Sequence, residues 1–402
     1  MCELSIVIVN YNVREYLEKL LSSIYDATNG IGKEIFVVDN NSSDESVEKI
    51  KEKFSDLILF ENKENIGFSK ANNVALKKCS GKYILLINPD TIIKNDTLRK
   101  MINFFNNYPD CGAAGCKVLN PDSSLQLACR RGFPSPFTSF SKISGLSKIF
   151  PKSKLFGKYN LTYLDSNKIN VVDAISGSFM MVRKEILEEV GYLDEDFFLY
   201  GEDIDWCYRI TKKGWKVYYY PEAEIIHFKG RSSQRSNIDT EKEFYRSMIL
   251  FVEKHFNSRY VLWFLKIGIW VIRWLTYFKR KLKIFAVKLI NSLFLNFKLF
   301  KINKRKLVIG SFADNIKING TFKNKGARDN SIVGVFNLTN MTFKNENKNE
   351  KLENETNLRK IIKDYKVNEI IFSSICITHK DILKVMEVCR GLKIRYELIS
   401  QN

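Results

Sequence analysis

The first 110 residues alternate short apolar runs with stretches of helical periodicity, and this rhythm constrains the fold more than any other feature. Four apolar runs predict strands at Leu4–Val9, Glu34–Val38, Leu57–Phe60 and Tyr83–Ile87. Helical spacing of apolar residues follows each of the first three strands. Strands that alternate with helices form a mostly parallel sheet with helices on both faces. We therefore expect an α/β fold whose ligands bind at the carboxyl ends of the strands.

Polar residues follow each of the four predicted strands. Singly, such residues favour helix caps and turns, but four polar ends on one sheet edge favour a binding crevice. Tyr11 offers a flat face for a nucleobase, Asp39 can accept an N–H from a pyrimidine ring, and Asp90 can hold Mg²⁺ or Mn²⁺ through a hard oxygen. The candidate donor-binding residues are Asn10, Tyr11, Asp39, Asn41, Asn65, Gly67, Asn72, Asn88 and Asp90.

A second group of acids lies mid-chain, in a Gly-Glu-Asp-Ile-Asp run. Glu202, Asp203 and Asp205 stand at the start of a predicted helix, where the macrodipole favours acids whatever their function. A carboxylate here could also act as a general base on a hydroxyl nucleophile. His227 follows a further strand. A lone histidine is more often structural, but this one could complete a metal site with Asp90.

The net charge of +19 is concentrated in one segment. Between Arg259 and Lys306 the chain has thirteen Lys or Arg residues, no Asp or Glu, and many Trp and Phe. The run Tyr260–Phe278 has 19 residues, near the length that spans a bilayer, but it carries two charges in its interior. We expect amphipathic helices in the interface of an anionic membrane, against the alternative of a helix packed on its own domain. We expect no nucleic-acid partner, because the charge is not spread across a groove.

The length of 402 residues predicts two or three domains. We expect a catalytic or binding domain in residues 1–256, the membrane-associating helices in residues 257–305, and a small α/β domain in residues 306–402. The eight cysteines form no C-x-x-C pair, and no secretory signal precedes them. We therefore expect reduced thiols in a cytoplasmic protein, held peripherally at the cytoplasmic face of the cell membrane.

Residues 4 to about 235 resemble the family 2 inverting glycosyltransferases, which have the GT-A nucleotide-diphospho-sugar transferase fold. The order and combination of several motifs carry the resemblance, and the Asn-Pro-Asp and Gly-Glu-Asp-x-Asp variants are similar to bacterial rhamnosyltransferases. The family usually has Asp-x-Asp at the fourth strand, whereas Asn88 here replaces the first acid. The motifs are Ile6–Asn12, Val37–Asp44, Asn65–Phe68, Asn88–Asp90, Ser176–Met180 and Gly201–Asp205.

This resemblance implies metal-dependent, inverting transfer of a hexose from a nucleotide diphosphate to a hydroxyl of a lipid-linked saccharide, in cell-surface polysaccharide synthesis. A dTDP-sugar of the rhamnose type is the favoured donor. Asp90 and His227 would hold Mg²⁺ or Mn²⁺, and Asp203, with Glu202 beside it, would be the catalytic base. The residues expected to bind the acceptor are Gly177, Ser178 and Asp205.

Residues 306–402 resemble, more weakly, the Rossmann-like domain of bacterial sugar-phosphate transferases. The phosphate loop of that fingerprint needs several glycines, and this chain has only Gly310 there, so we expect no nucleotide binding. A regulatory or assembly role, including a homo-oligomer formed through this domain, stays open. The alternative for the whole chain is a non-catalytic nucleotide-sugar-binding regulatory or scaffold protein. The intact Asp90, Asp203 and His227 favour the enzyme over that alternative.

Overall fold

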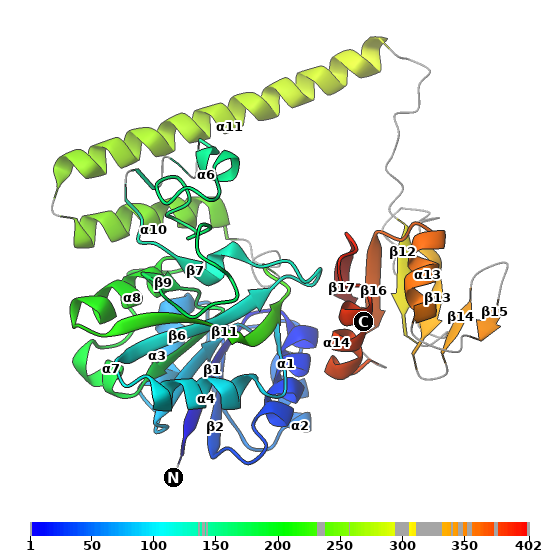
Figure 1. Ribbon diagram of the computed structural model, residues 1–402, viewed down its shortest axis with the longest axis horizontal. Coiled ribbons are helices and arrows are strands. Elements are labelled where there is room, and N and C mark those ends of the chain that lie inside the picture. The colour runs from blue at the N-terminus through cyan, green and yellow to red at the C-terminus, as the bar shows by residue number, and fades with distance from the viewer. Residues whose placement is uncertain are drawn as a thin grey trace.

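The computed structural model describes residues 2–135, 137–138, 141, 144–230, 238–256, 258–293, 305–310, 332–338, 341–344, 349–351, 356–373 and 377–399. Within these ranges the chain forms a larger α/β unit, two helices that follow it, and a smaller α/β unit (Figure 1). The predicted loop after Gly310 and the end of the basic segment lie outside the described residues.

The larger unit is built on a sheet that has nine strands among the described residues. Strands β1, β2, β3 and β4 pair in parallel, β6 pairs in parallel with β11, and β10 and β5 run antiparallel to their neighbours. The expected mostly parallel sheet and its four predicted strands are confirmed. In order across the sheet the strands are β3 (Leu57–Glu61), β2 (Lys33–Asp39), β1 (Leu4–Asn10), β4 (Tyr83–Ile87), β10 (Phe179–Arg183), β6 (Cys111–Leu119), β11 (Lys216–His227) and β5 (Thr91–Ile93), with β8 (Asn170–Val171) beside β11.

Helices connect these strands and bury their apolar stripes against the sheet. In α1 the buried Leu17, Leu20, Leu21 and Ile24 recur at helical spacing, as their sequence pattern predicts. The short strands β7 (Arg130–Arg131) and β9 (Ala174–Ile175) form a separate antiparallel pair. The helices of this unit are α1 (Arg14–Ala27), α2 (Ser46–Lys53), α3 (Phe68–Leu76), α4 (Thr97–Asn107), η1 (Leu127–Cys129), α6 (Leu146–Ile149), α7 (Glu185–Glu189) and α8 (Glu202–Lys212).

Two helices, α10 (Thr240–His255) and α11 (Arg259–Leu293), follow the larger unit. Leu265 and Ile269 of α11 pack against Val252 of α10 in a small apolar cluster. Beyond this contact α11 continues past α10 (Figure 1). In the part of the chain that the structure describes, no helix combines the length and the apolar character needed to cross a bilayer.

The smaller unit has its own sheet, in which β13, β12, β16 and β17 are adjacent and parallel. This parallel order agrees with the α/β class expected for residues 306–402, while the resemblance to sugar-phosphate transferases and the domain boundaries stay predictions. Its elements are β12 (Lys306–Ile309), β13 (Ile332–Asn337), β14 (Thr342–Lys344), β15 (Asn349–Lys351), α13 (Thr356–Asp364), β16 (Glu369–Ser373), α14 (His379–Val388) and β17 (Arg395–Ile399).

The two α/β units contact each other where α14 and β17 pack against α1 (Figure 1). The backbone N–H of Leu398 donates to the Tyr16 hydroxyl at 3.3 Å, and the Tyr16 ring meets the Phe228 ring with centroids 5.2 Å apart. Tyr16, Phe228 and Ile92 share one buried apolar cluster with Met386 and Leu398. The smaller unit therefore packs against the larger sheet beside its edge strand β5.

Candidate active site

The predicted donor-binding residues gather where β1, β2 and β4 end. Asn10 lies opposite Asp39 in the parallel register, and its amide donates to the Asp39 carboxylate at 2.7 Å. Ser42 donates to the same carboxylate through its backbone N–H at 2.8 Å and its hydroxyl at 2.6 Å. A carboxylate has about four acceptor sites, so Asp39 keeps room for a donor from a ligand. These contacts hold Asp39 in one orientation, as recognition of a base requires.

Amide side chains join the loops that follow β2 and β3. Asn40, rather than the predicted Asn41, makes this connection, since its amide donates to the Gly67 carbonyl at 3.1 Å and to Asn65 Oδ1 at 3.3 Å. Asn41 is exposed. Gly67 has φ +86°, and a Cβ there would lie 2.7 Å from the Phe198 ring. Both its backbone angle and the close approach of Phe198 therefore require glycine at position 67.

Two of the predicted residues carry buried acceptors that the protein leaves unsatisfied. The side-chain oxygens of Asn10 and Asn88 have no hydrogen-bond partner among the described residues. Such groups cost free energy unless a ligand or water satisfies them, so they favour a polar ligand at this edge of the sheet. Tyr11 lies half-buried just after β1. Asn72 instead donates to the Phe68 carbonyl within α3, at 2.8 Å.

Asp90 and His227, predicted to hold a metal, come together at the start of β5 and the end of β11. His227 Nε2 lies 3.1 Å from Asp90 Oδ1, and both side chains are buried. Gln126 fixes the imidazole, because its amide nitrogen donates to the His227 carbonyl at 2.7 Å while its Oε1 lies 3.0 Å from Nδ1. Since Gln126 presents an acceptor to Nδ1, that nitrogen carries the proton. In the neutral imidazole, Nε2 presents a lone pair to the Asp90 carboxylate.

This pair fits a divalent cation. Two acceptors facing each other at 3.1 Å repel unless a cation or a proton lies between them. His227 Nε2 has no hydrogen-bond partner in the described ranges, and its other ring nitrogen is held by a side chain, as is usual for a metal-ligating histidine. No group of three or more His, Cys, Asp or Glu able to hold a metal occurs among the described residues.

Asp203, the predicted base, lies in the first turn of α8 and is held by three donors. Arg131 of β7 donates to its Oδ2 at 2.5 Å, and the backbone N–H of Gly177 donates to the same oxygen at 3.0 Å. The N–H of Ile204 donates to Oδ1 at 2.8 Å. Burial opposes the charged form of Arg131, but the charge of Asp203, the neighbouring Tyr159 and the hydrogen bond to Asp203 together raise the pKa of Arg131. The pair is therefore an ion pair at neutral pH.

Glu202, next to the predicted base, is buried in a different state. Burial, and then the neighbouring charge of Asp203, raises the pKa of Glu202 to about 8. Glu202 is therefore mostly protonated at neutral pH, while Asp203 beside it is charged. Its Oε2 has no hydrogen-bond partner in the described part of the chain. The two neighbouring carboxyl groups thus divide into an anion that can accept a proton and a neutral acid that can donate a hydrogen bond.

One turn of the chain links the Asp90–His227 pair to Asp203, the predicted base. Gly177 in this turn donates to Asp203, while the next residue, Ser178, accepts from the backbone N–H of Asn88 at 3.2 Å. Asn88 is two residues before Asp90. The two groups that sequence analysis placed separately are therefore neighbours, and Gly177 and Ser178 lie between them.

A cavity of about 100 Å³ opens beside Glu202 and Asp203. Its walls combine these acids with aromatic rings from the loop before α8 and from α10, which suits the hydroxyl groups and the apolar face of a sugar. The residues that form the walls include Arg131, Tyr159, Tyr200, Glu202, Asp203, Phe244 and Phe251.

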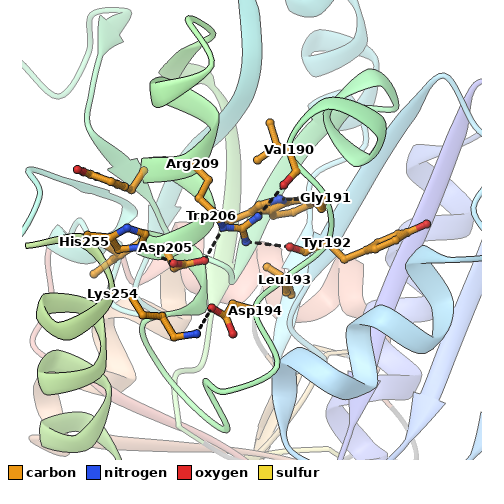
Figure 2. A network of polar contacts seen from close by, with 12 residues as sticks. Val190, Gly191, Tyr192, Leu193, Asp194, Asp205, Trp206, Arg209, Lys254 and His255 are labelled. Atoms are coloured by element: carbon orange, nitrogen blue, oxygen red, sulfur yellow. Dashed lines mark hydrogen bonds and ion pairs between the residues drawn. The ribbon is translucent and has the colours of Figure 1, made fainter.

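Asp205, predicted to bind the acceptor, does not line this cavity. Its buried carboxylate is 2.8 Å from Arg209 Nε and 2.6 Å from His255 Nε2 of α10, as Figure 2 shows. Arg209 also donates to the carbonyls of Val190 and Tyr192. The structure therefore gives Asp205 a different surrounding from Asp203, in a network that fastens α10 to α8.

Sequence analysis did not single out Gln126 and Arg131. Gln126 precedes and Arg131 follows the short run Leu127–Cys129, in a region whose apolar pattern is irregular. Their partners lie 101 and 72 residues away along the chain. Buried contacts over such separations leave no spacing that a single sequence reveals.

Comparison with known proteins matches part of the larger unit to a family. The family model described as glycosyl transferase family 2 matches residues 5–191. An N-acetylglucosaminyl-diphospho-decaprenol L-rhamnosyltransferase of Mycobacterium tuberculosis is 26% identical over 265 residues, which cover 62% of this chain and 83% of that protein. The rhamnosyltransferase WbbL of Escherichia coli K12 is 29% identical over 233 residues, which cover 56% of this chain and 82% of the relative.

Solved structures with similar folds include a mannosyltransferase from Pyrobaculum calidifontis in complex with GDP-Man and Mn²⁺. It covers 81% of each chain at 16% identity and a TM-score of 0.44, which is too low to carry an argument. The family match and the observed sheet order agree with the expected GT-A fold. Residues 5–191, which contain the donor-side strand ends, Asp90 and Gly177, therefore match glycosyl transferase family 2.

Proposed function

We propose that this glycosyltransferase moves a hexose, with inversion, from a nucleotide diphosphate to a hydroxyl of a lipid-linked saccharide in cell-surface glycan synthesis. The observation that carries the proposal is the charged Asp203, held by Arg131 at the wall of a cavity and one turn away from the Asp90–His227 pair. The names of the relatives favour a rhamnose-type sugar, and the name of the Mycobacterium tuberculosis protein favours a lipid-linked acceptor. The dTDP donor is favoured by the resemblance of the sequence motifs to bacterial rhamnosyltransferases.

The strand ends would bind the donor. Asp39, held by Asn10 and Ser42, would accept a hydrogen bond from an N–H of the nucleobase. The unsatisfied side-chain oxygens of Asn10 and Asn88 would accept hydrogen bonds from hydroxyl groups of the nucleotide sugar. Asp90 and His227 would hold Mg²⁺ or Mn²⁺. A bound divalent cation neutralises the diphosphate that leaves.

Asp203 would perform the proton transfer. As the acceptor oxygen forms its bond to the anomeric carbon, the acceptor O–H proton passes to the Asp203 carboxylate. The bond between the anomeric carbon and the diphosphate oxygen breaks, and the nucleotide diphosphate leaves with the electron pair. One displacement inverts the anomeric centre without a covalent enzyme intermediate. Glu202, as a neutral acid, would donate a hydrogen bond to the acceptor sugar.

Helix α11 would hold the enzyme peripherally at the cytoplasmic face of an anionic membrane. Trp263 and Trp270 are 59% and 67% exposed, and Phe264, Trp274, Phe278 and Phe285 are exposed as well. The absence of acids from residues 259–306 favours anionic headgroups over a protein surface of mixed charge. Because α10 lines the cavity and also packs against α11, this attachment would bring the cavity to the membrane surface, where a lipid-linked acceptor resides.

The test is a donor screen on the full chain that measures released nucleotide diphosphate. dTDP-, UDP- and GDP-sugars are offered with Mn²⁺ and a lipid-linked saccharide. Release that depends on the acceptor supports transfer, and the anomeric configuration of the product by NMR reports inversion. Donor binding without release under all conditions would favour the non-catalytic alternative.

A further inference from the structure

Gln126 and Arg131 stand at the two ends of one short connector, with η1 between them. The connector is fastened at both ends, since the Gln126 N–H donates to the Val118 carbonyl at 2.9 Å and Arg131 pairs with Ala174 between β7 and β9. The side chains of Gln126 and Arg131 are both buried. The Gln126 side chain contacts His227, and the Arg131 side chain contacts Asp203, the predicted base.

We propose that residues 126–131 form a positioning segment, in which Gln126 holds His227 in its metal-binding tautomer and Arg131 holds Asp203 in its proton-accepting orientation. This inference rests on the proposed function and deepens it, because it assigns roles to two residues outside the predicted site. Neither residue is a catalytic residue in this proposal, since each acts through its partner.

The tautomer of His227 decides whether the Asp90–His227 pair is open to a cation or closed by a proton. With the proton on Nε2, His227 would donate to Asp90 across 3.1 Å, and a proton would occupy the place of the cation. Gln126 opposes this closed state, because its Oε1 needs a donor from Nδ1 while its amide nitrogen is committed to the His227 carbonyl. Gln126 thus keeps Nε2 available as a metal ligand.

Arg131 controls both the direction and the charge of Asp203. Its guanidinium donates to the Ile175 carbonyl at 2.6 Å and to Asp203 Oδ2 at 2.5 Å, so the carboxylate is held relative to the β9 backbone. The other titratable groups around Asp203 are Tyr159 and, on α8, Glu202, Asp205 and Cys207. Arg131 is the cation among them that contacts Asp203 directly.

The neighbouring Arg130 supplies a matched control. It is buried like Arg131 and lies on the same short strand, but its guanidinium donates to the carbonyls of Leu164 and Asp165. A substitution at Arg130 therefore disturbs the same segment without touching Asp203. Effects that appear at Arg131 and not at Arg130 report positioning rather than general damage to the fold.

The first experiment reads the His227 tautomer directly. The full chain has three histidines, so long-range ¹H–¹⁵N spectra of ¹⁵N-histidine-labelled protein without metal are simple enough to assign. We expect an Nδ1–H tautomer in the wild type and in Gln126→Glu, and an Nε2–H tautomer in Gln126→Leu. Mn²⁺ binding, measured by EPR of the free ion, should weaken about 10- to 100-fold in Gln126→Leu. An unchanged tautomer and unchanged Mn²⁺ affinity in Gln126→Leu would overturn this half.

The second experiment separates orientation from charge at Asp203. Arg131→Lys keeps the charge but is shorter and lacks the planar guanidinium that joins Asp203 to the Ile175 carbonyl, so kcat should fall about 10- to 100-fold with the donor KM and the acidic limb of the pH profile near wild type. Arg131→Met should lower kcat further and move that limb to higher pH, because the positive charge that faces the Asp203 carboxylate is lost. Arg130→Lys should keep both the kcat and the pH profile.

The outcomes distinguish this proposal from the proposed function. If Arg131→Lys matched Arg130→Lys in kcat and pH profile, the positioning role would be overturned while the transferase proposal stood. If the wild type transferred no sugar but Gln126→Leu switched the tautomer, the function would fail while the Gln126 contact held. Should Arg131→Met fail to fold, Arg131→Lys still decides the case, with thermal unfolding checking each variant.

Discussion

The candidate active site and helix α11 both depart from the usual burial of apolar residues and exposure of charged ones, but in opposite ways. In the site, ionisable groups such as Asp203, Arg131 and Asp90 are buried, whereas on α11 large aromatic residues such as Trp263 and Trp270 are exposed. Both arrangements lower stability unless something compensates. The ion pair finds its compensation within the chain, because Arg131 and Asp203 satisfy each other. The exposed face of α11 finds none among the described residues, so its partner is expected outside the chain.

The largest expected effect comes from replacing Asp203, the buried acid whose charge Arg131 compensates. Asp203→Asn should lower kcat about 10²- to 10⁴-fold, because the amide cannot take the acceptor proton, while donor affinity stays unchanged. Steady-state release of nucleotide diphosphate and a separate donor-binding titration measure the two quantities. Asp205→Asn is the control, since it alters the same helix away from the cavity. Parental turnover in Asp203→Asn would show that another group is the base.

Removing the Asp90 carboxylate should have the next largest effect. Asp90→Asn should weaken Mn²⁺ binding about 100-fold and lower turnover at limiting metal, because an amide oxygen carries no charge to attract the cation. Calorimetric titration of Mn²⁺ and rates at a series of Mn²⁺ concentrations measure this. Asp110→Asn, at a half-buried acid paired with Lys216 away from the cation site, is the control. Full wild-type activity in EDTA would contradict metal dependence altogether.

Replacing the aromatic residues of α11 tests the other half of the comparison. Trp263, Trp270 and Trp274 changed together to Ser should lower affinity for anionic vesicles about 10- to 100-fold, because the apolar burial of three indole rings at the membrane interface is lost. Vesicle flotation at low and high salt separates the electrostatic from the apolar contribution to binding, since salt screens the basic residues and not the apolar contacts.

A control outside α11 sharpens this test. Phe150→Ser removes an exposed aromatic residue from the larger unit and should leave flotation unchanged. Equal binding of the wild type to neutral and anionic vesicles would remove the electrostatic contribution. Protection of one flank of α11 from protease in sealed vesicles would show that the helix crosses the bilayer, against the in-plane arrangement.

The smallest expected effect concerns the pH dependence of stability. Glu202 has its pKa raised from 4.5 to about 8 in the folded chain, so between these values the unfolded chain binds fewer protons and stability falls as pH rises. Glu202→Gln removes this loss, and its Tm relative to wild type should rise by a few degrees between pH 5 and pH 8.5. Thermal unfolding at the two pH values measures the difference. A constant difference would mean that Glu202 is charged in the folded protein.

The sequence predicts much of the sheet because strand and helix periodicities are local. It also predicts that polar strand ends meet, since parallel strands share one edge. It does not separate Asp203 from Asp205, which are chemically alike and two residues apart. On a helix that spacing is a rotation of about 200°, so one faces the cavity and the other faces Arg209 and His255. That assignment depends on how α8 is rotated against its neighbours, which is a property of tertiary packing.

The contact of the smaller unit with α1 and β5 also bears on how the protein is made. Tyr16, Ile92 and Phe228 are buried in a cluster completed by residues after Lys306. A ribosome adds residues 306–402 in about 5–20 s, and during that interval the larger unit exists with this apolar patch uncovered. The smaller unit therefore acts as an internal protector of the larger one, and a variant truncated before Lys306 should self-associate even though every candidate site residue is present.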